Sequence, residues 1–387
     1  MRSVNTRTSP PLADLTTLRI GGRPRDYVEV ETEEEFLDVV SAPEFGPEGD
    51  TPLLVLGGGS NLVVSDAPFE GTVVRDLRRD TRVLDDYACG GVTVSAPAGA
   101  VWDDLVALGV EEEWSGLEAL SGIPGSVGAA PVQNIGAYGR EIAEDLAQVR
   151  VFDRLTGRVE SMARFALKLG YRDSILKQSL TNPEVGGGVT WGPTGRWVVL
   201  DVQLQLPRGD LSMPIRYGEL ARYLGVDIGE RAPSRDVREA VLALRASKGM
   251  VLNPADHDTW SAGSFFTNPI LSVEEADELL PPDAPRFGVE NRSKVALANP
   301  HKPAPQVVGV VKTSAAWLIN RSGFTKGWSL YPDAPAALST KHVLALTNRG
   351  GATSQDIIDL ARAVRDGVRK QVGISLVPEP VFVGATL

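Results

Sequence analysis

The stretch 121–139 constrains the fold more than any other part of this sequence. It reads Ser-Gly-Ile-Pro-Gly-Ser-Val-Gly-Ala-Ala-Pro-Val-Gln-Asn-Ile-Gly-Ala-Tyr-Gly and contains no aspartate, glutamate or lysine. Glycine and proline recur so often that the pattern predicts neither a regular helix nor a regular strand. Such a backbone can lie flat against a ligand and direct N–H groups at anionic oxygens, although the same composition also suits a plain surface loop.

A second glycine loop, Gly57-Gly-Gly-Ser-Asn61, follows directly after the apolar run Leu53–Leu56. Two loops of this kind favour a ligand-binding function over two unrelated turns. The second loop lacks the third glycine and the long helix of a Rossmann dinucleotide-binding unit. The sequence also lacks the Gly-x4-Gly-Lys-Ser/Thr pattern, which excludes a P-loop protein.

Composition narrows the class of protein further. A chain of 387 residues can hold two or three domains with buried cores. A net charge of −11 argues against nucleic-acid binding but is compatible with an anionic small-molecule substrate. One cysteine, Cys89, excludes an internal disulfide, and with three histidines it argues against a structural zinc site. No run of 18 apolar residues and no apolar N-terminal segment occurs, so we expect a cytoplasmic protein without membrane insertion.

Periodicity and turn residues predict the regular elements. Short strands are expected within 14–30, and a flexible loop over 181–195. The expected helices are 33–40 (capped by Thr32), 101–109 (ended by Gly109), 234–248, 312–319 and 353–372 (stopped by Gly373). The expected strands are 53–56, 62–64, 71–75, 92–96, 148–152, 197–206, 343–347 and 376–383. Repeated prolines over 280–306 predict a loop or an insertion within the last domain.

Six short motifs follow one another along the chain: Gly57-Gly-Gly-Ser-Asn61, Ser121-Gly-Ile-Pro-Gly-Ser-Val-Gly128, Gln133-Asn-Ile-Gly-Ala-Tyr-Gly139, Gly170-Tyr-Arg-Asp-Ser174, Gly263-Ser-Phe-Phe-Thr-Asn-Pro269 and Pro378-Glu379. In this order they resemble the UDP-N-acetylenolpyruvoylglucosamine reductase family, flavoenzymes of peptidoglycan synthesis. The similarity runs from Asn5-Thr6 to Gly384. Tyr217 in Arg-Tyr-Gly-Glu-Leu220 resembles the type I subtype, in which a tyrosine loop closes over the substrate.

The resemblance implies an α+β fold: a two-part FAD-binding fold of the PCMH/vanillyl-alcohol-oxidase type, followed by a C-terminal α+β substrate domain. The implied domains are 1–76, 77–248 and 249–374, with 375–387 returning to the active site. FAD would be noncovalent. NADPH would reduce it, and the flavin N5 would pass hydride to the enolpyruvyl group of UDP-N-acetylglucosamine enolpyruvate, giving UDP-N-acetylmuramate. The residues themselves do not distinguish NADPH from NADH.

In this family the two glycine loops hold the cofactor. Their backbone N–H groups would cradle the FAD pyrophosphate, and the side chains of Ser60 and Asn61 would add hydrogen bonds. The expected FAD contacts are Gly57, Gly58, Gly59, Ser60, Asn61, Ser121, Gly122, Ile123, Pro124, Gly125, Ser126, Gly128, Asn134, Gly136, Ala137 and Tyr138.

Three residues far apart in the sequence are expected to catalyse the reaction. Hydride adds to the β-carbon of the enol ether, so negative charge spreads onto the carboxylate and the α-carbon must be protonated. Arg172 offers a permanent forked donor for the carboxylate, and Ser264 is the family's proton donor. Glu379 could share the task of Arg172. An ionised carboxylate would repel the developing enolate, so our hypothesis is that Glu379 acts protonated or strongly hydrogen-bonded, with a pKa raised by burial.

The substrate contacts implied by the family are Tyr171, Tyr217, Lys248, Asn268 and Lys326, whose cations suit a diphosphate. Three departures from the family pattern occur. Pro378-Glu-Pro-Val381 lacks the basic residue often found two positions after the glutamate. Ala129-Ala130 replaces a Gly/Ser pair, and 280–306 is longer than expected.

Simpler interpretations remain for each residue alone. Arg172 and Asp173 could form a surface ion pair, Ser264 could be a turn residue, and Glu379 could be a solvated edge residue. Two other functions are an FAD-dependent alcohol or sugar-lactone oxidase of the same fold and a non-catalytic flavin-binding module. The absence of histidine around Gly57–Asn61 argues against such an oxidase, and the joint presence of Arg172, Ser264 and Glu379 argues against the module.

Overall fold

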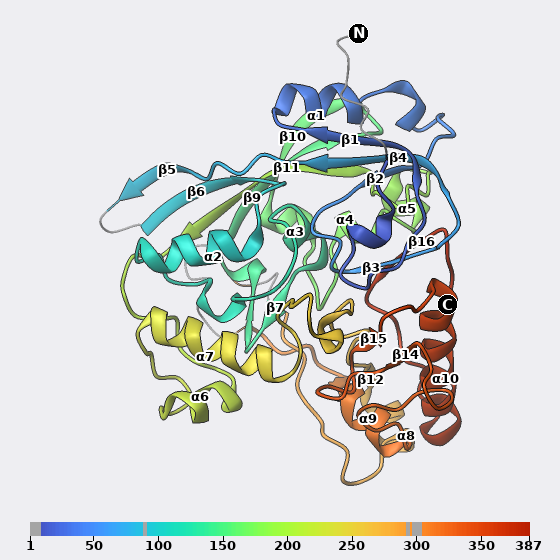
Figure 1. The fold of residues 1–387 in the computed structure, drawn as a ribbon. Helices are drawn as coiled ribbons and strands as arrows, with labels where there is room; N and C mark the ends of the chain where they lie inside the picture. The colour runs from blue at the N-terminus through green and yellow to red at the C-terminus, as the bar shows by residue number, and fades with distance from the viewer. Residues whose placement is uncertain (1–8, 88–90, 292–294, 296–303) are drawn as a thin grey trace.

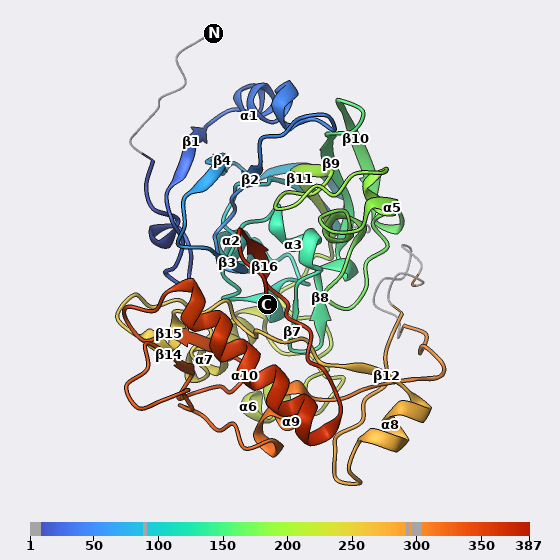
Figure 2. The same cartoon turned by 90° about the vertical axis from the view of Figure 1, so that its right-hand side faces the viewer.

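The computed structural model describes residues 9–87, 91–291, 295 and 304–387. Two sheets form the upper part of the molecule; the first helix lies above them, and most of the other helices lie beside or below them (Figures 1 and 2). The first sheet is parallel, with strand order β1-β4-β2 (β1 Pro24–Val30, β4 Phe69–Asp76, β2 Leu53–Val55). Helix α1 (Glu33–Val40) begins as predicted, because Thr32 and Glu35 form a capping box.

The second sheet has five antiparallel strands in the order β10-β9-β11-β6-β5. Their bounds are β5 Arg82–Tyr87, β6 Gly91–Pro97, β9 Leu146–Asp153, β10 Arg158–Ala163 and β11 Trp197–Leu206. Helix α2 (Trp102–Glu111) packs in the same core. The prediction that Gly109 ends this helix was wrong, because the chain turns later, at Glu113, with a left-handed φ of 58°.

Part of the glycine-rich stretch 121–139 is regular, contrary to our prediction. Residues Ala129–Gln133 form the one-turn helix α3, and the short strand β7 (Gly136–Ala137) pairs with β8 (Arg140–Glu141). Helix α3 forms because 129–133 contains no glycine and because Pro131 lies in the first turn, where proline is tolerated.

The middle of the chain supplies four helices. These are α4 (Ile175–Gln178), α5 (Pro183–Gly186), α6 (Gly218–Leu224) and α7 (Ser234–Ser247). Helix α7 matches its prediction, and α6 packs against it. Helix α5 corrects the expected loop over 181–195. Asn182 caps it and Pro183 occupies its first turn, which together favour a helix start.

The C-terminal part contains helices α8 (Val273–Leu279), α9 (Ala315–Arg321) and α10 (Ser354–Val372), with the pairs β12–β13 (Ile270–Ser272, Val310–Lys312) and β14–β15 (Ala336–Leu338, Leu346–Asn348). Helix α10 is confirmed, with Thr353 capping it and Gly373 in the left-handed region. The helix expected at 312–319 begins only at Ala315, because Ser314 caps it there and Lys312 ends β13. The strand expected at 343–347 is the shorter β15.

The last strand returns to the start of the chain. Strand β16 (Val381–Val383) pairs in parallel with β3 (Leu62–Val64), beside the loop Gly57–Asn61 (Figure 2). Leu18, Ile20 and Val63 also share one hydrophobic core with α9 and α10. The N-terminal and C-terminal parts therefore meet at the glycine loop. The domain boundaries at 76 and 248 stay a prediction.

Some sequence observations fall outside the described residues. These are Asn5, Thr6, Cys89 and, within the proline-rich 280–306 stretch, residues 292–294 and 296–303. Within the described ranges, we find no helix that combines the length and the apolar character needed to span a membrane.

Candidate active site

The two glycine loops lie directly against each other. A Cβ atom on Gly58 would come within 2.6 Å of Gly125 Cα, and one on Gly57 within 2.5 Å of Ser126 Oγ. The Ser60 hydroxyl donates to the carbonyl of Pro124 at 2.7 Å. Glycine is therefore required at 58 for close backbone approach, a side chain at 57 would displace the Ser126 hydroxyl, and the two loops form one surface.

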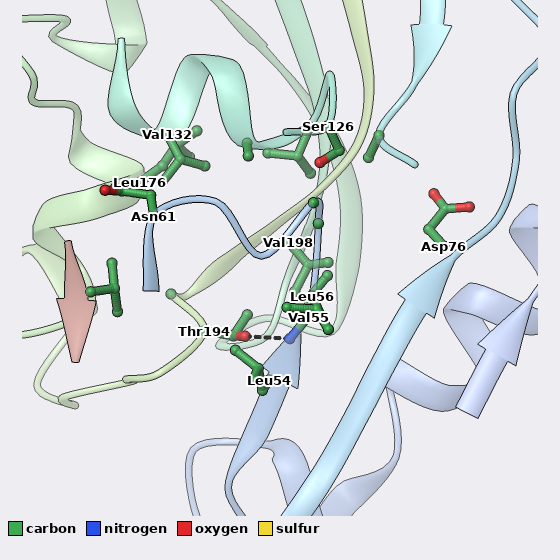
Figure 3. Close-up of a pocket in the computed structure, with 18 of the residues that line it drawn as sticks. Leu54, Val55, Leu56, Asn61, Asp76, Ser126, Val132, Leu176, Thr194 and Val198 are labelled. Carbon is green, nitrogen blue, oxygen red and sulfur yellow. Dashed lines mark hydrogen bonds between the residues drawn. The ribbon is translucent and has the colours of Figure 1, made fainter. Parts of the chain in front are cut away.

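A first cavity opens along this surface and encloses about 1010 Å³ of empty space, part of it open to solvent. Small-molecule sites in proteins commonly reach this size. Gly57–Asn61, Ser126 and Gly128 line one side. Most of the rest is apolar, with polar side chains at Asp76, Gln133 and Thr194; the apolar residues include Leu54, Val132, Leu176 and Val198 (Figure 3). The Val55 N–H donates to Thr194 Oγ1 at 2.7 Å and ties the loop after α5 to β2 (Figure 3).

A second cavity of about 860 Å³ adjoins the first, sharing Ser60, Asn61, Ser126, Ala129 and Gln133 with it. Arg172, Ser264 and Glu379 all line this second cavity. The spatial convergence on which our sequence interpretation depended is therefore present. The catalytic roles of the three residues stay predictions.

Arg172 is held tightly at the cavity wall. Its backbone is left-handed, with φ 56°, and its guanidinium donates to the carbonyls of Asn134 (3.3 Å) and Gly136. Arg172 Nε lies 3.6 Å from Glu379 Oε1. Asp173 instead accepts from Gln178, at 2.6 Å, so the alternative of an Arg172–Asp173 surface pair is not what the structure shows.

Ser264 and Glu379 are brought together by two neighbouring extended segments. The Glu379 N–H donates to the Phe265 carbonyl at 2.9 Å, and Phe266 pairs with Pro378 in an antiparallel bridge. Phe265 and Phe266 are buried, and Phe265 also contacts Phe382 of β16. The buried pair Phe265 and Phe266 thus anchors the segment that presents Ser264 to the cavity.

Sequence reasoning missed Lys177, in the one-turn helix α4. Its ammonium donates to Gln133 Oε1 (2.9 Å), the Arg172 carbonyl (3.2 Å) and the Glu379 carbonyl (3.3 Å). Burial lowers the pKa of Lys177. This lysine joins the backbones of two candidate catalytic residues. Its only sequence signal was its place between apolar residues and polar ones in a short helix.

Arg245 of α7 was also missed, although it lines the second cavity. Its Nη2 donates to the Met250 carbonyl at 2.8 Å, and burial lowers its pKa to about 10. Arg245 Nε and Asn61 Nδ2 are buried without a hydrogen-bond partner in the described part of the chain. Buried donors normally have acceptors, so two orphaned donors on one cavity fit a ligand rich in anionic or carbonyl oxygens, such as FAD.

The predicted cofactor residues divide into two groups. Eleven of the sixteen line one or both cavities: Gly57, Gly58, Gly59, Ser60, Asn61, Ile123, Pro124, Gly125, Ser126, Gly128 and Gly136. Ser121, Gly122, Asn134, Ala137 and Tyr138 do not. Ser121 donates to the Glu118 carbonyl (2.7 Å), the Gly122 N–H to Asp103 Oδ1 (2.6 Å) and Asn134 to the Gly170 carbonyl (2.7 Å). These three residues shape the loop.

The predicted substrate residues lie in two places. Tyr217 meets Tyr138 edge-to-face at 5.5 Å, and Lys248 lies 5.9 Å from the Tyr138 ring centroid and 2.5 Å from Glu219 Oε2. The positive charges of Lys248 and Lys326 both lower the pKa of His342. In the second place the Asn268 N–H donates to Tyr171 Oη at 3.4 Å, and Asn268 Oδ1 accepts from the Ala315 N–H at 2.9 Å.

His342 should make the ligand-free protein less stable in mild acid. Burial first, and then Lys248 and Lys326, lower its pKa to about 4 from 6.5. The unfolded chain therefore binds the proton more readily, and stability is lost as pH falls from 6.5 toward 4. We expect His342→Gln to remove about 3 kcal/mol of this pH dependence. Denaturant unfolding at pH 7 and pH 4 measures it, and identical pH dependence in both proteins would contradict the expectation.

The comparisons with known proteins agree with this geometry. Residues 24–163 match the family described as FAD binding domain, and residues 253–383 match UDP-N-acetylenolpyruvoylglucosamine reductase, C-terminal domain. Fold, cavities and matched domain define an FAD-dependent oxidoreductase. UDP-N-acetylenolpyruvoylglucosamine reductase from Cutibacterium acnes is 49% identical, covering 97% of this chain and 90% of that protein. The Thermobifida fusca reductase is also 49% identical, covering 97% and 98%. The chain belongs to the UDP-N-acetylenolpyruvoylglucosamine reductase family.

A solved structure supports the fold. The crystal structure of UDP-N-acetylenolpyruvylglucosamine reductase from Thermus caldophilus superposes with a TM-score of 0.59 at 24% identity, covering 98% of this chain and 99% of that one. The predicted fold class, an FAD-binding fold followed by a C-terminal α+β part, is confirmed. The predictions of an oxidoreductase and of FAD as its cofactor are confirmed as well.

Proposed function

We propose that this protein reduces the enolpyruvyl group of UDP-N-acetylglucosamine enolpyruvate to UDP-N-acetylmuramate in peptidoglycan synthesis, with NADPH as reductant. The observation that carries the proposal is that Arg172, Ser264 and Glu379, from three distant stretches, line one cavity that adjoins the paired glycine loops. Membership of the reductase family supports the same reaction. Bound FAD supplies the hydride-transfer chemistry.

The glycine loops and two unpartnered donors hold the cofactor. Gly57–Gly59 and Gly125 line the two cavities and present backbone to the ligand there. Asn61 Nδ2 and Arg245 Nε, both buried, supply side-chain donors. The first cavity has apolar walls that suit the flat rings of a dinucleotide, and the second brings the reactive end to the three candidate catalytic residues.

Arg172 binds the substrate carboxylate. Two of its nitrogens are held by the carbonyls of Asn134 and Gly136, which fix the plane of the guanidinium. Lys177 holds the backbone of the same residue and that of Glu379. Preorganised donors stabilise developing negative charge without reorganising during the reaction. Glu379 contributes from beside Arg172, and the hypothesis that it acts in its protonated form stays a prediction.

Ser264 gives a proton to the substrate α-carbon. A hydroxyl is a weak acid, so the site must stabilise the negative charge that remains on the Ser264 oxygen after the proton leaves. Arg172 and Arg245 line the same cavity and bring two positive charges to it. Tyr217, Lys248 and Lys326 bind the diphosphate end of the substrate, and Lys248 then exchanges its ion pair with Glu219 for the phosphate.

The cell compartment is part of the same proposal. We assign the protein to the cytoplasm, because a single cysteine suits a reducing compartment.

Purified protein should be yellow and should be bleached by NADPH under anaerobic conditions. The colour should return when UDP-N-acetylglucosamine enolpyruvate is added, and far more slowly with air alone. Absorbance near the flavin band records both steps. A colourless protein that takes up no FAD would rule the proposal out, and recovery in air as fast as with substrate would favour an oxidase.

A further inference from the structure

A buried carboxylate, Glu144, lies between two segments that the proposed function uses. Its side chain is only 2% exposed. Glu144 Oε2 accepts from Arg140 Nη1 at 2.6 Å and from Arg216 Nη1 at 2.8 Å. Hydrogen bonds between ionised groups are among the strongest in proteins, and screening by water is weak at this depth. Glu144 therefore joins two arginines from distant parts of the chain.

Each arginine belongs to a segment of the candidate site. Arg140 directly follows the glycine-rich stretch that ends at Tyr138-Gly139, and Arg216 directly precedes Tyr217. The two segments touch, since a Cβ on Gly139 would come within 2.9 Å of Arg216 Cβ. They meet again where the rings of Tyr138 and Tyr217 pack edge-to-face at 5.5 Å. Glu144 thus lies beneath the point where the tyrosine segment meets the glycine-rich stretch.

The two ends of this connection differ in how firmly they are held. Arg140 is buried and has a second carboxylate, Asp145, at 2.6 Å. Arg216 is 25% exposed and Tyr217 is 44% exposed, although the flanking Ile215 and Leu220 are buried in a small hydrophobic core with α7. The partly exposed Arg216 and Tyr217 side chains are not fixed by burial of this kind, so their positions depend on a few specific contacts.

We propose that Glu144 is a positioning residue that holds Arg216 and thereby places Tyr217 against Tyr138 at the substrate site. The inference rests on the proposed function, in which Tyr217 contacts the substrate. Asp145 holds Arg140 and Arg140 holds Glu144, and Arg216 transmits that position to the tyrosine segment.

Arg216→Met is the sharpest test, because it cuts the connection and leaves the buried Arg140–Glu144–Asp145 group intact. We expect the KM for UDP-N-acetylglucosamine enolpyruvate to rise about tenfold, the usual worth of one charge-assisted hydrogen bond, with kcat and FAD content nearly unchanged. Arg216→Lys should restore part of the lost affinity. Glu144→Gln should raise KM similarly, and the double variant should add little to Arg216→Met.

Amide hydrogen exchange of residues 214–224 provides a readout that does not depend on the substrate. Exchange should be faster in Arg216→Met than in wild type and unchanged in the control Arg286→Met, which removes an exposed ion pair with Asp277. Unchanged exchange and KM in Arg216→Met would overturn the positioning role. Loss of kcat and FAD with unchanged KM would also overturn it. Wild-type protein that does not turn over the substrate would overturn the proposed function, while the exchange measurement would still decide the role of Glu144.

Discussion

Replacing Ser264 with alanine should slow the substrate-dependent phase of turnover by roughly 10²–10⁴-fold, the usual worth of a positioned acid. The α-carbon of the substrate must receive a proton, and the Ser264 hydroxyl lines the cavity that Arg172 and Glu379 share. The loss of one oxygen should leave the cavity walls intact, because the neighbouring Phe265 and Phe266 are buried and anchor the segment. Stopped-flow absorbance measures this phase after anaerobic reduction with NADPH.

The control for Ser264→Ala is Thr267→Val, which removes a hydroxyl from the same segment. Thr267 Oγ1 donates to the Val377 carbonyl at 3.4 Å and is not among the residues that line the cavity. We expect Thr267→Val to react nearly as wild type does. In Ser264→Ala, reduction by NADPH before substrate is added should keep its wild-type rate. Equal slowing of both phases would contradict the assigned role of Ser264 as proton donor.

Features that depend on local backbone chemistry were predictable from the sequence. The run Gly57–Gly59 needs close approach to Gly125 and to Leu15, and only glycine permits it. Helix α10 has a capping box at Thr353 and a left-handed Gly373, and the residues that give both signals can be recognised in the sequence. The glycine loops and the longest helix were found for these reasons.

Features that depend on tertiary contacts were not predictable from residue patterns alone. Lys177 and Arg245 are ordinary cations in sequence, and their importance comes from burial beside Arg172 and around the second cavity. Helix α3 was not predicted, because its five residues lie within a glycine-rich stretch. The return of β16 to β3, which brings Glu379 to the site, was expected only through the family resemblance.

The contacts of Glu144 are a further feature that residue patterns alone could not predict. Arg140 and Glu144 lie outside the six motifs, and Arg216 was noted only as the neighbour of Tyr217, 72 positions from Glu144 in sequence. Only in the folded structure does one carboxylate accept hydrogen bonds from both arginines. A charged residue next to a glycine-rich stretch can therefore anchor a neighbouring segment of the site, even where its sequence pattern suggests a solvent-exposed position.

Replacing Arg172 with methionine should lower kcat/KM for the substrate by roughly 10²–10³-fold, as the loss of a preorganised donor to developing negative charge does. Arg172→Lys should lose less, because it keeps the positive charge but not the planar fork. Both substitutions retain a side chain at the left-handed φ of 56°, so their backbone strain matches that of wild type. Steady-state kinetics with varied substrate measures kcat/KM directly.

Folding and cofactor binding must be controlled in these variants, because Arg172 also donates to the carbonyls of Asn134 and Gly136. FAD content and thermal unfolding separate a lost catalytic contact from a displaced loop. If Arg172→Met keeps its FAD and its kcat/KM within about twofold of wild type, the guanidinium does not bind the reacting carboxylate. If kcat/KM falls as far in the lysine variant as in the methionine variant, charge alone does not stabilise the developing enolate. The reaction then requires the planar fork of the guanidinium.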